Sequence, residues 1–504
     1  MKMQDALIDI IGAGSRVEKH RPWPRVVVDA DIWQRIASEL AASRWTLSGL
    51  WGDSGAVHMA LLDEGKSDIT VVSLECPDGR FPSVAQYQAP AIRLERTIRD
   101  LFGLEPENAP DPRPWLDHGR WGLRHPLGAR TESSDTKPYA FLSAEGESLH
   151  QIAVGPVHAG IIEPGHFRFN VNGEAIVRLE TRLGYTHKGI EALMQGADLE
   201  RAAKLAGRVS GDSTVAYAIA FARAAEVALG MQAPARAHWL RALMAELERL
   251  ANHFGDIGAI CNDASFALMH AHCAILRERV LRAADECFGH RLMRDCVVPG
   301  GVAADLDIKN IPALRTLLTE IGKRFPALVE LYDNTASLQD RTVTTGILKP
   351  ALAQQFGAGG YVGRASGRAF DARRAFVYPP YDRLSFEVPV LQEGDVNARV
   401  WIRIQEVKQS LALIEQILAN LPDGAIRTEL PRGAGEGMAL VEGFRGDVLV
   451  WLRLDGEGRI ARCHLRDPSW FQWPLLEAAI EGNIVADFPI CNKSFNCSYS
   501  GCDL

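Results

Sequence analysis

The segment WLRALMAELERLANHFGDIGAI, residues 239–260, has the pattern of a long helix that packs into a protein core. Its apolar side chains recur every three or four residues, which is the spacing of one helix face. They are Leu240, Leu243, Met244, Leu247, Leu250 and Phe254. Two more stripes of this kind follow, at positions 269, 273, 276, 280 and 287 and at positions 400, 404, 407, 411, 414 and 418. We therefore expect a helical bundle.

Two β-hairpins are expected at the margins of this bundle. Residues 166–171 alternate apolar and polar side chains, and Asn172-Gly173 then supplies the positive φ angles of a tight turn into residues 174–179. Residues 448–454 and 459–465 form a second pair of β-like runs, joined by a glycine-rich turn. Both pairs predict strands beside the helices.

The N-terminal part has another composition. Short β-like runs at residues 25–28, 57–62 and 69–74 alternate with a helical pattern at residues 30–42. This mixture predicts a small α+β domain whose fold is independent of the rest.

A polar stretch separates the two parts. The run ARTESSDTK, residues 129–137, is closed by Pro138 and is too poor in apolar residues to offset the entropy of ordering. We therefore assign residues 1–130 to the first domain, 131–150 to a linker and 151–504 to the second domain. The predicted class is α+β, with an N-terminal α+β domain followed by a mainly helical core with marginal β-hairpins.

Composition excludes several classes of function. The formal net charge of −8 over 504 residues disfavours nucleic acid as a partner. The longest apolar stretch, residues 215–229, is interrupted by Arg223 and Glu226, so no membrane-spanning helix is expected. The N-terminus does not read as a secretory signal, and the nine cysteines form no CxxC pair, so we expect a cytoplasmic protein. Nucleotide-binding and serine-hydrolase motifs are also absent.

A few residues could carry chemistry by their type and position alone. His158 lies in the loop sequence GPVHAG, where the backbone and not core packing would position the side chain. Charged pairs inside apolar helical stretches, such as Arg403 with Glu406, could form buried proton paths or could face solvent. Cys497 and Cys502 could bind a metal or could be two thiols of a packed tail.

Several segments resemble a known family in the order in which they occur. In the first domain these are LERTIRDLFGL (94–104) and WGLRHPLG (121–128). In the second domain they are GPVHAGIIEPGHFRF (155–169), LGYTHKGIE (183–191), ELERLANHFGDIGAI (246–260), VPGGV (298–302), RASG (364–367) with Asp371 and Arg373, Gly394-Asp395, and VEGFRGD (441–447). They resemble the large subunit of group 4 membrane-bound nickel-iron hydrogenases, of the formate hydrogenlyase and hydrogenase-4 type, and a fusion of the C-type and D-type subunits of NADH-quinone oxidoreductase (complex I).

This resemblance implies a C-type domain followed by a D-type core that is similar to a hydrogenase large subunit. It also implies partners: a small subunit that carries an iron-sulfur cluster, and ion-translocating membrane subunits. The protein would then be peripherally associated with the inner face of the cell membrane.

The sequence differs from this family at the positions of the metal ligands. A nickel-iron centre uses four cysteine thiolates because soft anionic sulfur binds nickel and bridges to iron. In this chain RVSGDS (208–213) places Ser210 and Ser213 at the first two ligand positions, and SFNCSYSGCDL (494–504) places Ser498 and Gly501 at the last two. We therefore expect no nickel-iron centre. A slipped site built on Cys497 and Cys502 would offer only two thiolates.

Two functions remain open. In the first, a metal-free redox subunit of an oxidoreductase complex passes electrons from the neighbouring iron-sulfur subunit to quinone or another acceptor. His158 would bind the acceptor and Ser210, Ser213 and Asp212 would line its cavity, while Glu191 would belong to a proton path. In the second, the protein is a non-catalytic scaffold that couples redox and ion-translocating subunits. A true hydrogenase is disfavoured by the missing ligands.

Overall fold

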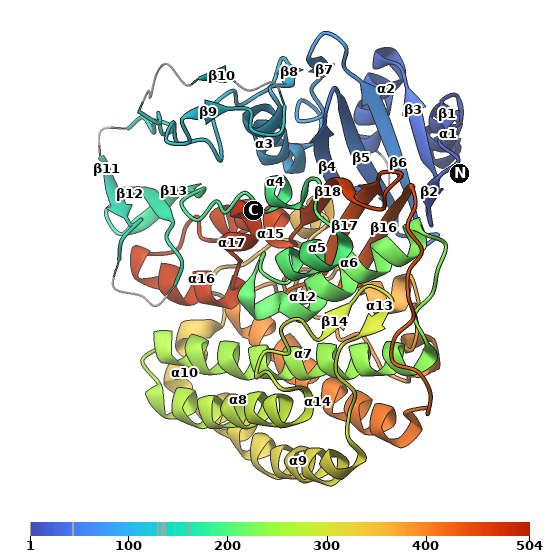
Figure 1. Ribbon diagram of the computed structural model, residues 1–504. Helices are drawn as coiled ribbons and strands as arrows, with labels where there is room; N and C mark the ends of the chain where they lie inside the picture. Colours follow the sequence, from blue (N-terminus) through green and yellow to red (C-terminus); the bar gives the residue numbers. More distant parts are fainter. Residues whose placement is uncertain (1, 43–44, 129–130, 133–137, 147, 159–161) are drawn as a thin grey trace.

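The computed structural model describes residues 2–504 except 43–44, 129–130, 133–137, 147 and 159–161. It confirms the α+β class: an N-terminal sheet with helices lies at one end of the molecule, and a helical core forms the other end (Figure 1). Parts of the predicted linker, residues 133–137 and 147, lie outside the described residues.

The N-terminal region is built on a five-stranded sheet with the order β1-β3-β6-β5-β4. Its strands and helices are β1 (Ser15–Arg16), β3 (Arg25–Val28), β4 (Trp45–Asp53), β5 (Ala56–Asp63), β6 (Asp68–Glu75), α1 (Lys2–Gly12), α2 (Ala30–Ala42) and α3 (Ile92–Phe102). A short parallel pair, β7 (Arg80–Pro82) and β8 (Glu105–Glu107), follows the sheet. The three predicted strands and the predicted helix of this region are confirmed.

The second sheet has the order β18-β17-β16-β2. Its strands are β2 (His20–Arg21), β16 (Gly435–Glu442), β17 (Asp447–Leu454) and β18 (Ile460–Arg466). The hairpin predicted at 448–465 is confirmed as β17 and β18.

The two sheets share one apolar core. Trp51 and Val71 of the first sheet pack in a cluster with Met438 and Trp451 of the second, and the rings of Trp51 and Trp451 lie 5.6 Å apart. Strand β2, near the N-terminus, pairs in parallel with β16. The prediction of an independent N-terminal fold is therefore wrong, because that sheet buries one face against the second domain.

A third, antiparallel sheet has the order β11-β12-β13. Its strands are β11 (Leu149–Val154), β12 (His166–Asn172) and β13 (Ala175–Arg182). Asn172 pairs with Ala175 across the turn, and Gly173 has a φ of 60°. The predicted Asn-Gly hairpin is thus confirmed.

The core contains the long helices α6 (Thr214–Ala228), α7 (Ala235–Asp263), α8 (Ala267–Phe288), α9 (Ile311–Asn334) and α14 (Val396–Asn420). The stripe predicted around Leu247 belongs to α7 and is fully buried, and the other two stripes belong to α8 and α14. In the described part of the protein, no helix combines the length and apolar character needed to span a bilayer.

Shorter elements place the candidate site. They are α4 (Ile190–Met194), α5 (Leu199–Ala206), α15 (Ser469–Ala479), α16 (Phe488–Phe495) and α17 (Ser500–Asp503). Helix α6 lies directly against β16, and a Cβ on Gly437 would meet the carbonyl oxygen of Ala224 at 2.0 Å. Glycine at that position allows the close approach of α6 to the sheet.

The remaining segments connect these elements. They are α10 (Ala336–Thr342), α11 (Pro350–Gln355), α12 (Gly360–Ala365), α13 (Ala372–Ala375), and the strand pairs β9 (Leu123–Arg124) with β10 (Thr131–Glu132) and β14 (Val297–Val298) with β15 (Gly301–Val302).

Candidate functional site

The four positions that the resemblance assigns to metal ligands converge in the structure. Ser210 and Ser213 lie in the loop between α5 and α6, and Ser498 and Gly501 lie in the tail after α16. The Oγ atoms of Ser210 and Ser498 are 2.8 Å apart, and the backbone N–H of Gly501 donates to Ser498 Oγ at 2.9 Å. All four residues are buried. We call this set the serine cluster.

An ion pair covers one side of the serine cluster. Arg445, in the turn between β16 and β17, forms two hydrogen bonds with the Asp212 carboxylate, one of them at 2.6 Å. Asp212 also accepts hydrogen bonds from the hydroxyls of Ser210 at 2.9 Å and Ser213 at 3.4 Å. Burial raises the pKa of Asp212, but Arg445 outweighs this effect and lowers the pKa to about 2. Asp212 is therefore ionised at neutral pH.

Asp212 connects the cluster to the surface. Its side chain is 36% exposed, whereas that of Arg445 is 5% exposed. A pocket of about 210 Å³ between α7, α8 and α16 is lined by Asp212 together with Asp256 and Lys493. This polar pocket reaches Asp212, which hydrogen-bonds to two serines of the cluster.

A carboxylate fills the space next to Gly501. A Cβ at this position would meet the carboxyl carbon and one oxygen of Asp467 at 2.6 Å. The Asp467 carboxylate accepts a hydrogen bond from the hydroxyl of Tyr217 at 2.7 Å, and both residues are fully buried. A cysteine at position 501 therefore does not fit unless Asp467 moves.

The donors present do not fit a nickel-iron centre. The ligand positions carry three hydroxyls and a hydrogen atom where such a centre needs thiolates. Cys497 and Cys502 are buried, and burial raises the pKa of both thiols, which keeps them protonated. Among the described residues, no group of three or more His, Cys, Asp or Glu side chains is placed to hold a metal ion.

His158 and Glu191 are the remaining predicted site residues. His158 is half-buried in the loop after β11, whose residues 159–161 are outside the described part of the protein, and the hydrogen bonds given above for the serine cluster go to other residues. The buried carboxylate of Glu191, on α4, pairs with Arg462 at 2.9 Å and with His464 Nδ1 at 2.8 Å. Burial raises its pKa, but these partners outweigh burial and lower it to about 2.

The charged pairs within helices separate into two kinds. Arg277 and Glu278 of α8 face solvent, where Glu278 pairs with Arg282. Glu406 of α14 is buried, and its carboxylate accepts hydrogen bonds from Arg364 at 2.5 Å and from His253 Nε2 at 2.7 Å. The buried kind forms a polar network in the core.

Sequence reasoning assigned no role to Arg445 or to Asp467. Arg445 is part of the quoted segment VEGFRGD and could have been found there. Tyr217 and Asp467 are 250 positions apart, and no local pattern links them. Glu248 of α7 accepts the backbone N–H groups of Val215 and Ala216, the residues that follow the serine loop.

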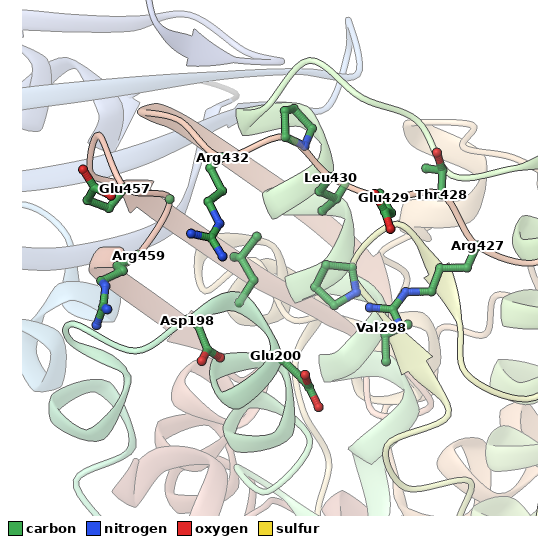
Figure 2. Close-up of a pocket in the computed structure, with 14 residues that line it drawn as sticks. Asp198, Glu200, Val298, Arg427, Thr428, Glu429, Leu430, Arg432, Glu457 and Arg459 are labelled. Carbon is green, nitrogen blue, oxygen red and sulfur yellow. The ribbon is translucent and has the colours of Figure 1, made fainter.

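A larger hollow lies elsewhere in the molecule. A groove of about 750 Å³ runs between α5, residues 427–432 and the turn after β17. Figure 2 shows Arg432 and Asp198 on opposite walls of this groove. It is lined by exposed side chains of both charges and contains none of the predicted site residues.

The sequence and the fold are similar to those of known protein families. The family model for the respiratory-chain NADH dehydrogenase 49 Kd subunit matches residues 263–434 and 428–504, and that for the 30 Kd subunit matches residues 26–137. A nickel-dependent hydrogenase model matches residues 188–255. Formate hydrogenlyase subunit 5 of Escherichia coli K12 is 30% identical over 90% of this protein and 82% of its own length.

The protein belongs to the family of hydrogenase large subunits and complex I 49 Kd subunits. Within this family, hydrogenase-4 component G of Escherichia coli K12 is 32% identical over 89% of this protein and 80% of its own length. The D-type subunit of the NADH-quinone oxidoreductase of Dehalococcoides mccartyi is 32% identical over 66% of this protein and 92% of its own length.

A solved structure supports the same family. It is one component of the membrane-bound sulfane sulfur reductase, described as an archaeal respiratory membrane complex, with a TM-score of 0.68 and 25% identity. The match covers 72% of this protein and 100% of that component. The hydrogenase and complex I family therefore accounts for both domains, including the 30 Kd-like N-terminal one.

Proposed function

We propose that this protein is the large subunit of a membrane-associated electron-transfer complex that lacks a nickel-iron centre. In this proposal it passes electrons from the iron-sulfur cluster of a neighbouring small subunit to a quinone or another small acceptor beside the serine cluster. One observation supports it above the others: hydroxyls and the Arg445–Asp212 pair meet at the positions that we predict to correspond to the family's metal ligands, and Asp212 is reached from a polar pocket.

The chemistry assigns separate roles to these side chains. Reduction of a quinone to a quinol consumes two electrons and two protons, and the neighbouring cluster would supply the electrons one at a time. The Arg445 guanidinium would stabilise the negative charge that develops on the acceptor oxygen. Asp212 is ionised, so we assign it the task of holding Arg445, while the protons come from water in the polar pocket.

The roles predicted for His158, Ser210 and Ser213 stay proposals. The serine hydroxyls can donate to an acceptor carbonyl, and His158 would approach the acceptor from the loop after β11. Glu191 is ionised and its carboxylate is held by Arg462 and His464. These contacts favour a role for Glu191 in joining α4 to β18 over a role in a proton path.

The partners and location follow from the family. We propose that the protein binds a small iron-sulfur subunit and ion-translocating membrane subunits, on the cytoplasmic face of the membrane. The relatives named above support this, since one of them is part of a respiratory membrane complex.

A second candidate function is a scaffold without catalysis. The direct hydrogen bond between Ser210 and Ser498 and the carboxylate of Asp467 beside Gly501 favour it, because both fill the space that a ligand would need. A scaffold requires only that these contacts around the serine cluster be stable.

The test uses the complex purified with its natural partners. We expect no stoichiometric nickel, no hydrogen evolution, and quinone reduction that falls at least tenfold in Asp212→Asn. Asp295→Asn is the control, because the Asp295 side chain is 36% exposed, as that of Asp212 is, and pairs with Arg208 outside the cluster. An equal loss of quinone-reduction activity in both variants, or no quinone reduction by the unaltered complex, would favour the scaffold. Nickel near one per large subunit with hydrogen evolution would overturn both candidates.

A further inference from the structure

A further cavity lies between the two domains, beside the C-terminal residue Leu504. Its volume is about 200 Å³. Leu101 of α3 and Leu127 form the wall on the N-terminal side, and His187, Ala192 and Leu504 form the wall on the other. Figure 1 shows the C-terminus beside α4 and below α3. The cavity contains none of the serine cluster.

The floor of this cavity is aromatic. The rings of Trp121 and His187 stack with centroids 4.7 Å apart and planes inclined by 29°. Most of the other lining side chains are aliphatic. The carboxylate of Glu191, which also borders the cavity, is already paired with Arg462 and His464 on the side of β18. The floor therefore offers a flat ring surface inside an apolar wall.

His187 offers a polar atom to a ligand in this cavity. His187 Nδ1 lies 2.6 Å from the carbonyl oxygen of Asp503, so Nδ1 must carry the proton that is donated. In the neutral ring Nε2 is then a hydrogen-bond acceptor. Nε2 lies 3.9 Å from the point where a Cβ of Gly189 would stand, and Gly189 lines the same cavity. The backbone thus fixes the tautomer and leaves the acceptor beside the cavity.

Size and polarity together define the ligand. A dry apolar cavity of about 150 Å³ is known to take up benzene, and drug-sized ligands need about 300 Å³ or more. We propose that this cavity binds one small planar ring that carries a hydroxyl group, of the phenol or hydroquinone class. The ring would lie against Trp121 and its hydroxyl would donate to His187 Nε2.

The test compares two probes of nearly equal shape. p-Cresol has a hydroxyl that can donate, and 4-methylanisole has the same ring with that hydrogen replaced by a methyl group. We expect p-cresol to bind the full-length protein in its complex about five to ten times more tightly, as measured by calorimetry or by ligand-observed NMR. Equal affinity for the two probes, or binding of neither, would overturn the inference.

Variants separate the hydrogen bond from the cavity. His187→Phe keeps an aromatic ring against Trp121 and should lower p-cresol affinity to the level of 4-methylanisole. Ala192→Phe should fill the cavity and abolish binding of both probes. The control His272→Phe changes an exposed histidine on α8 and should leave binding unchanged.

Two further outcomes decide the matter. Binding that persists in Ala192→Phe would place the ligand elsewhere and contradict the proposal. Binding by the isolated protein that disappears in the complex would mean that a partner side chain occupies the cavity, which would also contradict it. Neither probe is an electron acceptor, so these results are independent of the quinone-reduction assay.

Discussion

Glu248 should hold a proton at neutral pH. Its carboxyl group on α7 accepts the backbone N–H groups of Val215 at 2.7 Å and Ala216 at 3.1 Å, at the start of α6. Burial raises its pKa from the ordinary 4.5 to about 8, and these hydrogen bonds offset only part of that rise. The nearby negative charge of Asp212 contributes to this rise.

The pKa of Glu248 makes stability depend on pH in a defined window. The folded protein binds this proton more tightly than the unfolded protein, so the stabilisation is complete below pH 4.5 and is lost as the pH rises to about 8. The difference between the two pKa values corresponds to about 5 kcal/mol, an upper limit for one buried carboxyl group. Within the window the slope approaches about 1.4 kcal/mol per pH unit.

The perturbation is Glu248→Gln, which keeps the shape and removes the titration. We expect urea midpoints of the variant to fall less than those of the unaltered protein between pH 6 and pH 8. The infrared band of a protonated carboxyl group should be present at pH 7 in the unaltered protein, titrate near pH 8 and be missing in the variant. Glu278→Gln changes an exposed carboxylate and serves as the control. A carboxyl band that titrates below pH 5 would refute the reasoning.

Three further substitutions test the packing of the site. Gly501→Ala should lower the free energy of unfolding by about 1–3 kcal/mol in urea melts, because its Cβ would meet Asp467 at 2.6 Å. The control Gly322→Ala should be neutral or stabilising, because its Cβ would meet nothing within 4 Å. Tyr217→Phe leaves the buried Asp467 carboxylate without its hydroxyl donor and should cost about 1–3 kcal/mol in the same melts. Glu191→Gln removes the countercharge of buried Arg462 and should lower the free energy of unfolding by about 3–5 kcal/mol at pH 7. Because the pKa of Glu191 is about 2, this difference in free energy between the variant and the unaltered protein should shrink as the pH falls from 4.5 towards 2.

The elements with a strong local pattern were predicted well. The stripe through Leu247 and Phe254 became α7 because burial of one helix face imposes a period of 3.6 residues. Asn172-Gly173 became a hairpin turn because those residues tolerate positive φ angles. Independence of the first domain failed because the face of Trp51 that meets Trp451 looks like any other strand face in the sequence.

The site was predictable only in part. Resemblance to the family picked out Ser210 and Ser498, which the structure brings to 2.8 Å although 288 positions separate them. It gave no sign of Asp467, whose carboxylate occupies the space beside Gly501. Nor did any pattern show that Glu191 would be held by Arg462. Such contacts depend on how distant segments pack, which the local sequence does not encode.

The two carboxylates of the site differ in what it costs to disturb them. Asp467 and its donor Tyr217 are fully buried, so separating them would leave one carboxylate oxygen and the tyrosine hydroxyl unpaired in the core, although Ser469 N–H still donates to the other oxygen. Asp212 is 36% exposed, and water can replace part of what it loses when its ion pair with Arg445 opens. In the proposed function, an acceptor that entered the cluster would therefore displace the Asp212 side chain first. Asp212 is accessible from the polar pocket and the Asp467–Tyr217 pair is stable for the same reason, which is that the two carboxylates differ in burial.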